Sequence, residues 1–138
     1  MKPAFIDTSF LLALTVADDD LHGRAVAWQR ALRVPLVTSQ FGLLEYLDAM
    51  AKPLEKQLAL STVEVLQNQP AIEIVPLSEA LLAEGIAAMR GFADKEWGIT
   101  DCISFHIMRQ RSITSALTHD RHFEQAGFEA LLRHEPPN

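Results

Sequence analysis

The sequence predicts a single α/β domain in which short buried strands alternate with helices. Short apolar runs and stretches of helical periodicity follow one another in the order β-α-β-α-α-β-α-α-β-β, without a repeat or a linker between them. A chain of 138 residues has the length of one domain and can bury about two-thirds of the surface that its unfolded form exposes. No apolar run approaches the ~20 residues that a membrane-spanning helix needs, so we expect no membrane association.

The first strand is predicted at Ala4–Ile6 and leads directly into Asp7. Two hydroxyl residues follow the aspartate, and a helical apolar pattern then runs from Phe10 to Val16. A buried parallel strand delivers a carboxylate in this way to the rim of a sheet, where α/β proteins keep their chemistry. Taken alone the pattern is weak, because an aspartate after a strand is more often only a turn residue or a helix N-cap.

The other elements are predicted from apolar periodicity and from residues that start or stop helices. Ser39 and Ser78 are the expected N-caps of two helices, Gly91 is expected to end the helix that Ser78 caps, and Gly127 is expected to end the short helical turn over 121–125. We expect strands over 35–38, 71–76, 113–117 and 128–132, and helices over 22–32, 40–50, 53–66, 79–89, from 99 onward and, as a short turn, over 121–125. The domain is predicted to span residues 1–133, and residues 134–138 are predicted to form a frayed tail.

Three further acidic residues lie where they can converge on Asp7. Glu45 belongs to an apolar helix, although an ordinary surface glutamate would fit the same position. Asp101 falls in the first turn of a largely apolar helix, where the helix dipole favours an ionised carboxylate and where simple capping is an equal explanation. Asp120 follows the strand at 113–117, directly after a hydroxyl residue and a histidine.

Four converging carboxylates would strongly repel one another. At ~5 Å and an effective dielectric of ~20, each pair costs about 3 kcal/mol, so the six pairs together would exceed the stability of a whole domain. The cluster is tolerable only if some groups take up protons or a divalent cation neutralises them. An all-oxygen site suits Mg²⁺ or Mn²⁺, and the five scattered histidines show no spacing typical of a zinc site. Such a site is suited to metal-assisted phosphodiester hydrolysis, and no phosphate-binding glycine loop or serine-nucleophile motif offers another chemistry.

The composition limits how the chain can meet a polyanion. The formal net charge is −6, which argues against binding nucleic acid by bulk charge alone. A nucleic-acid substrate would need a bound cation or a local basic patch, for which Lys52, Arg109, Arg111 and Arg121 are the candidates. The single cysteine, Cys102, and the lack of a signal-peptide pattern predict a cytoplasmic protein.

Four segments together carry a family resemblance. They are Phe5–Ser9, Gly42–Leu47, Trp97–Phe105 and Leu117–Phe128, and they contain Asp7, Glu45, Asp101 and Asp120 in turn. In this order and spacing the chain resembles PIN-domain proteins over nearly its whole length, and most of all the VapC-type toxins of bacterial toxin–antitoxin pairs. Any one of these motifs is weak, whereas the four together are specific.

The resemblance implies a fold and a site. The fold is a single PIN-like domain with a five-stranded parallel sheet, order 3-2-1-4-5, flanked by helices. Asp7, Glu45, Asp101 and Asp120 match the family's metal-binding and catalytic quartet, and Asp94 matches a further acidic position. Ser9 and Thr118 match hydroxyl positions that orient the first and fourth aspartates.

The resemblance also implies an activity and partners. The activity is that of a Mg²⁺- or Mn²⁺-dependent endoribonuclease, in which metal-activated water hydrolyses an RNA phosphodiester. A cognate antitoxin blocks the site, and a homodimer is the usual toxin unit. Two alternatives stay open: a housekeeping PIN-type nuclease of RNA processing, and a catalytically silent protein-interaction module on the same scaffold.

Overall fold

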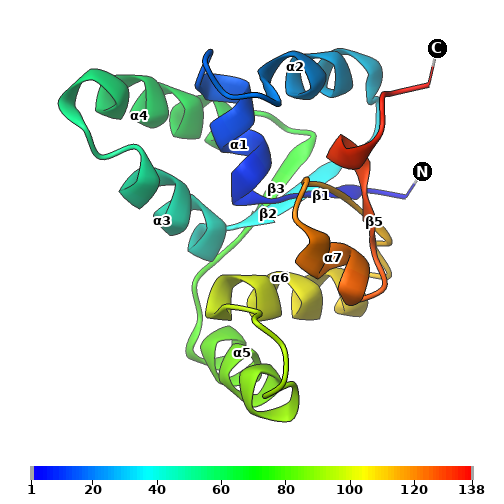
Figure 1. Ribbon diagram of the computed structural model, residues 1–138. Coiled ribbons are helices and arrows are strands. Elements are labelled where there is room, and N and C mark those ends of the chain that lie inside the picture. The colour runs from blue at the N-terminus through cyan, green and yellow to red at the C-terminus, as the bar shows by residue number, and fades with distance from the viewer. Residues whose placement is uncertain (1, 138) are drawn as a thin grey trace.

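In the computed structural model, which describes residues 2–137, helices cover both faces of a central sheet (Figure 1). The strands are β1 (Ala4–Ile6), β2 (Leu36–Ser39), β3 (Ile72–Val75), β4 (Ser115–Leu117) and β5 (Glu129–Ala130). The helices are α1 (Thr8–Thr15), α2 (His22–Ala31), α3 (Gln40–Ala49), α4 (Pro53–Gln67), α5 (Glu79–Gly91), α6 (Ile99–Gln110) and α7 (Arg121–Gln125), followed by a 3₁₀ turn at Leu131–Arg133. Within residues 2–137 no helix is both long and apolar enough to cross a membrane.

The five strands form one parallel sheet in the order β3-β2-β1-β4-β5, which confirms the predicted α/β class and strand order. The innermost strand is β1, where Phe5 pairs with Val37 of β2 on one side and with Ala116 of β4 on the other. The chain leaves β1 and β4 toward opposite faces of the sheet, because α1 and α7 pack in different cores. In open parallel sheets a crevice forms at such a point, outside the carboxyl ends of the two strands.

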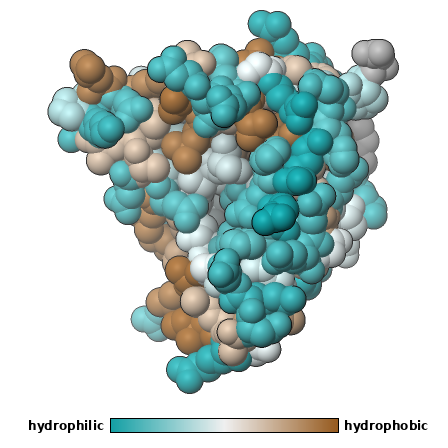
Figure 2. Space-filling view, viewed as in Figure 1, coloured by the Kyte–Doolittle hydropathy of each residue, from teal (hydrophilic) through white to brown (hydrophobic). Residues whose placement is uncertain are grey.

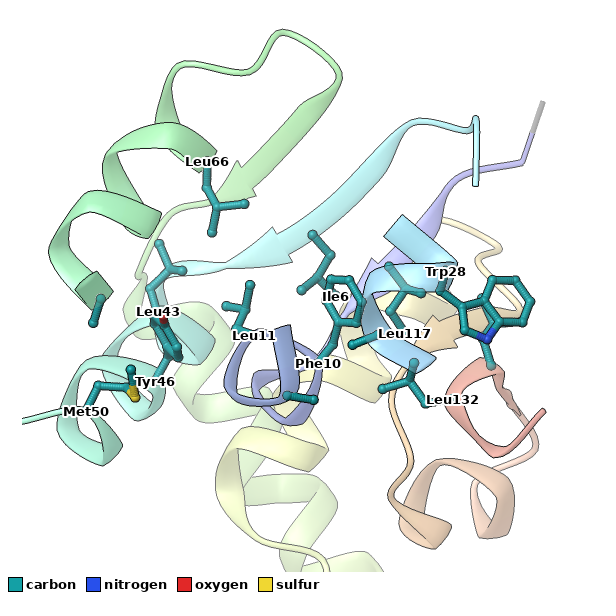
Figure 3. Packing of buried hydrophobic residues seen from close by; sticks show 14 residues of the cluster. Ile6, Phe10, Leu11, Trp28, Leu43, Tyr46, Met50, Leu66, Leu117 and Leu132 are labelled. Carbon is teal, nitrogen blue, oxygen red and sulfur yellow. The ribbon is translucent and has the colours of Figure 1, made fainter. Parts of the chain in front are cut away.

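Two hydrophobic cores lie on the two faces of the sheet. Ile6 and Leu117 point into the core formed with α1, α2, α3 and α4 (Figure 3). Phe5 and Ala116, one residue earlier in each strand, point into the core formed with α6 and α7. Since side chains alternate along a strand, both faces of these strands must be apolar, and this explains the short uninterrupted apolar runs in the sequence.

Several element boundaries differ from the predicted ones. The first helix begins at Thr8 rather than Phe10, because Asp7 takes the N-cap conformation and both hydroxyl residues enter the first turn. The predicted strand over 128–132 keeps only Glu129–Ala130; the chain then turns, and the Leu132 amide donates a hydrogen bond to the Thr118 carbonyl. The tail residues His134 and Glu135 accept hydrogen bonds from Trp28 and Arg24, at 2.8 and 3.1 Å. The division at residue 133 stays a prediction, and its outermost residues, 1 and 138, lie outside the described range.

The helices α5 and α6 approach each other closely at Gly85. A Cβ atom built at this position would lie 2.6 Å from Cγ1 of Ile103 and 2.8 Å from Cδ1 of Ile99. Glycine is therefore what lets α5 press against α6, the helix that begins at the crevice. The closeness explains why a helix interior contains a residue with poor helix propensity.

We expect Gly85→Ala to destabilise the protein by about 1 kcal/mol, since overpacking costs ~1–3 kcal/mol and the gain in helix propensity returns ~1 kcal/mol. The matched control is Gly91→Ala on the same helix, where a Cβ atom would meet nothing within 4 Å. Urea unfolding of both variants checks the expectation. Equal stabilities for the two variants would contradict it.

Candidate active site

Asp7 lies at the crevice with its carboxylate held by two hydroxyl groups. It occupies the N-cap position of α1, but its side chain makes no capping hydrogen bond. Instead, Oδ2 accepts hydrogen bonds from Ser9 Oγ at 2.7 Å and from Thr118 Oγ1 at 2.8 Å. The residue is only 7% exposed. The simple capping interpretation of this aspartate is therefore excluded, because the carboxylate is aimed across the crevice toward β4.

Burial changes the acidity of Asp7. Its pKa is raised to about 6, mainly by the loss of solvent and to a smaller extent by the negative charges of Asp101 and Glu45. The two hydroxyl hydrogen bonds favour the ionised form and act against this increase. The Asp7 carboxylate thus lies close enough to Glu45 of α3 and to Asp101 of α6 to interact electrostatically with both.

Thr118 joins the two strand ends that border the crevice. Its buried hydroxyl donates to Asp7, as described, and accepts a hydrogen bond from the backbone amide of Asp120 at 3.1 Å. The hydroxyl of Ser9 lies 3.1 Å from that of Thr118. These contacts fix the position of Asp7 relative to the start of α7, although the two segments are more than 100 residues apart in the chain.

Asp101, Asp120 and His122 form a compact cluster beside this pair of strands. Each offers one ligand atom, and these atoms all lie within 4.8 Å of one another. His122 Nδ1 lies 3.0 Å from Asp101 Oδ2 and 3.4 Å from Asp120 Oδ1. Asp120 Oδ1 also accepts the His122 backbone amide at 2.8 Å, so the aspartate caps α7 while keeping its carboxylate at the crevice.

The pKa of Asp101 is shifted in the direction opposite to the one that the helix dipole favours. We predicted that the helix dipole would favour the ionised carboxylate in the first turn of α6. In the structure, burial raises the pKa of Asp101, and the charge of Asp120 adds to the increase, while the His122 hydrogen bond lowers it. Desolvation outweighs the dipole because the carboxylate is partly enclosed by the neighbouring acidic groups and α7.

Of the two remaining acidic residues that we predicted, Glu45 lies near the site and Asp94 does not. Glu45 is on an exposed part of α3, whose first turn is fixed to the crevice by the Thr8 hydroxyl, which donates to the Gly42 carbonyl at 3.2 Å. It reaches the site through its electrostatic effect on Asp7. Asp94 is not brought to the cluster: its side chain is 77% exposed in the turn before α6 and lies 3.7 Å from Lys95.

Two of the four basic candidates for phosphate contact are used elsewhere. Arg111 pairs with Glu73 at 2.6 Å, and Arg109 lies over the ring of Phe128, 5.2 Å from its centroid. Both are near the C-terminal end of α6, about 12 Å (Arg109) and about 15 Å (Arg111) along the helix axis from Asp101 by the rise per residue. Arg121 is exposed and directly follows Asp120 in the chain, and Lys52 is exposed at the N-cap of α4.

Within residues 2–137 no lysine or arginine pairs with Asp7, Glu45, Asp101 or Asp120. A set of carboxylates at one crevice, two of them with raised pKa, therefore lacks a permanent positive partner in the chain. Oxygen donors without such a partner fit a hard divalent cation of the Mg²⁺ or Mn²⁺ type.

Comparison with known protein families agrees with this architecture. The sequence model of the PIN-domain family matches residues 4–129, which is nearly the whole sequence. The chain belongs to the PIN-domain family. This match confirms the family resemblance carried by the four segments. A separate search of the curated proteins finds no match.

Solved structures share the fold of this PIN domain at low sequence identity. VapC20 of Mycobacterium tuberculosis, described as a toxin that cleaves the sarcin–ricin loop, superposes with a TM-score of 0.83 at 24% identity, covering 91% of this chain and 95% of its own. FitAcB from Neisseria gonorrhoeae gives 0.66 at 22% identity, with 92% and 95% covered. A toxin–antitoxin complex from Klebsiella pneumoniae gives 0.61 at 14% identity, with 86% and 87% covered.

Sequence reasoning missed one residue of this PIN domain's crevice, His122. We treated the five histidines as scattered, because none has a zinc-site spacing relative to another. The available signal was its position two residues after Asp120, at the start of a helix capped by that aspartate. A side chain there can turn back toward the capping carboxylate, and the structure shows that it does.

Proposed function

We propose that this PIN domain is a Mg²⁺- or Mn²⁺-dependent endoribonuclease and acts as the toxin of a toxin–antitoxin pair. The observation that carries the proposal is the group of carboxylates at the switch crevice with no lysine or arginine partner among the described residues. PIN domains are generally nucleases, and the fold is shared with proteins described as toxins. We assign Asp7, Glu45, Asp101 and Asp120 as the catalytic and metal-binding residues.

The residues of the crevice have different proposed roles: some orient a carboxylate, and others bind the metal. Ser9 and Thr118 orient the Asp7 carboxylate by donating to one of its oxygens, which leaves the other oxygen free for a ligand. Asp101 and Asp120 come from α6 and the start of α7, and Glu45 approaches from α3, so the donors meet from separate elements. A divalent cation bound by these carboxylates would supply Lewis-acid activation of water and neutralise charge on the RNA phosphate.

The surface supports protein partners, which we propose to be a cognate antitoxin and a second copy of the chain. Large apolar side chains are exposed on two helices: Leu54 on α4 is 97% exposed, and α5 exposes Leu82, Ile86 and Met89 at helical spacing. Figure 2 shows hydrophobic residues gathered over these two helices, at the upper left and the lower left. Contiguous exposed apolar surface is typical of interaction sites. We place the protein in the cytoplasm, where an RNA substrate and an antitoxin are available.

The proposal is tested by incubating the purified chain with structured RNA and sequencing the new 5′ ends. We expect cleavage at discrete positions with Mg²⁺ or Mn²⁺, loss of cleavage with EDTA, and recovery when the metal is returned in excess. Expression should arrest growth, and co-expression of the product of the neighbouring gene should relieve the arrest.

Other outcomes would replace the proposal. Cleavage confined to one precursor RNA, without growth arrest, would identify a housekeeping processing nuclease instead. Calorimetry that detects neither Mg²⁺ nor Mn²⁺ binding, together with no cleavage, would identify a catalytically silent interaction module.

A further inference from the structure

We propose that His122 is a metal ligand, binding through Nδ1 together with Asp101 and Asp120, and that this nitrogen makes the site selective for Mn²⁺ over Mg²⁺. The inference rests on the divalent-metal dependence in the proposed function and adds to it a donor and a preference. It concerns a residue outside the acidic quartet.

The distances between the three donors suit a single ion. Neighbouring ligands of an octahedral cation bound at ~2.1 Å lie about 3 Å apart, and opposite ligands about 4.2 Å apart. His122 Nδ1 is 3.0 Å from Asp101 Oδ2 and 3.4 Å from Asp120 Oδ1, and all three donors fall within 4.8 Å. The 3.0 Å separation is that of a hydrogen bond between His122 Nδ1 and Asp101. When the imidazole carries its only proton on Nε2, the lone pair of Nδ1 stands at the spacing of an adjacent ligand to each carboxylate.

The local structure holds the imidazole in this position. Asp120 caps α7 through the His122 amide, and the next residue, Phe123, is buried edge-on against Phe105 with ring centroids 4.9 Å apart. The helix start and this aromatic anchor together set the direction of the His122 side chain. The side chains of Asp101, Asp120 and His122 are between 20% and 35% exposed, so an ion that keeps some of its water can reach them.

A nitrogen donor changes which ion the site prefers. Mg²⁺ is a hard cation that prefers oxygen donors and gives up its bound water molecules reluctantly. An imidazole nitrogen strengthens the binding of first-row transition ions relative to Mg²⁺, and Mn²⁺ is the one among them that also suits carboxylates. An all-oxygen quartet would not make this distinction so strongly.

Pulsed EPR of the 138-residue chain loaded with one equivalent of Mn²⁺ tests the assignment directly. We expect ¹⁴N modulation from a coordinated imidazole in the wild type, its replacement by a ¹⁵N signal when histidine alone is ¹⁵N-labelled, and its loss in His122→Asn. The matched control is His106→Asn, a half-buried histidine on α6 that lies 3.8 Å from Glu84 and outside the crevice. This control should retain the ¹⁴N signal.

Calorimetry with Mn²⁺ and with Mg²⁺ gives a second measurement. We expect His122→Asn to weaken Mn²⁺ binding by about tenfold and Mg²⁺ binding much less, so that the selectivity ratio falls. A wild type that binds Mn²⁺ and cleaves RNA but shows no histidine nitrogen signal, or an unchanged selectivity ratio in the variant, overturns the His122 assignment and leaves the proposed function standing. Absence of any metal binding by the wild type overturns both.

Discussion

Asp101→Asn should reduce metal-dependent RNA cleavage by at least about 100-fold, because it removes a charged metal donor from the set of four carboxylates. Asparagine has the same shape and can still accept the Gly98 amide, which lies 3.3 Å from the carboxylate. The fold is therefore expected to survive the change. Initial cleavage rates at saturating Mn²⁺ measure the loss, and melting curves in EDTA measure the fold.

The control for this variant is Asp48→Asn on α3, an exposed aspartate one turn beyond Glu45. It removes the same charge from the protein without touching the crevice, so its cleavage rate should match the wild type. Wild-type cleavage by Asp101→Asn would show that α6 contributes no donor. Severe destabilisation of Asp101→Asn in EDTA would show instead that the carboxylate is structural.

Asp7→Asn should make the metal-free protein more stable at neutral pH, by up to about 3 kcal/mol. The pKa of Asp7 is raised to about 6 in the fold from an ordinary value of 3.8, so the folded state holds this proton more tightly than the unfolded state does. The wild type therefore loses stability as the pH rises from about 4 to about 6, and the loss of about 3 kcal/mol persists above that range. Asparagine does not ionise, yet its carbonyl oxygen can still accept the Ser9 and Thr118 hydroxyl groups.

The measurement is urea unfolding of both proteins in EDTA at pH 4 and at pH 7.5. We expect nearly equal free energies of unfolding at pH 4 and a higher free energy of unfolding for Asp7→Asn at pH 7.5. In thermal unfolding the same difference corresponds to a melting temperature about 10 °C higher. Excess Mn²⁺ at pH 7.5 should stabilise the wild type and give the variant little. A variant that is less stable than the wild type at pH 7.5 without metal would mean that the ionised carboxylate is favourable in the fold.

The strand order was predictable only through motifs. Strands of three residues, such as β1 and β4, are too short for periodicity to show which of them are neighbours. The order came from the family resemblance, which implied that the first and fourth strands are neighbours and that Asp7 and Asp120 therefore lie at one crevice. The four acidic segments considered together therefore predicted more than any one element did.

His122 and Arg109 show where prediction from sequence ended. The direction of the His122 side chain depends on how α7 packs, and that depends on the contact between Phe123 and Phe105 from a distant segment. Arg109 is charged and exposed, yet its guanidinium covers Phe128 and donates to the Ala126 carbonyl at 2.9 Å. Both outcomes are set by tertiary packing that residue type and spacing do not contain.

The Thr118 hydroxyl, shared between Asp7 and the Asp120 amide, has a consequence during protein synthesis. Its hydrogen bond to Asp7 spans 111 positions of the chain, and β1 gains its β4 neighbour only after residues 115–117 have been made. A ribosome-bound nascent chain that has exposed only its first hundred residues carries neither Thr118 nor Asp120. Such a fragment lacks the hydroxyl that holds Asp7 and also lacks the carboxylate of Asp120, so the candidate site is assembled only after the chain has been made as far as residue 120.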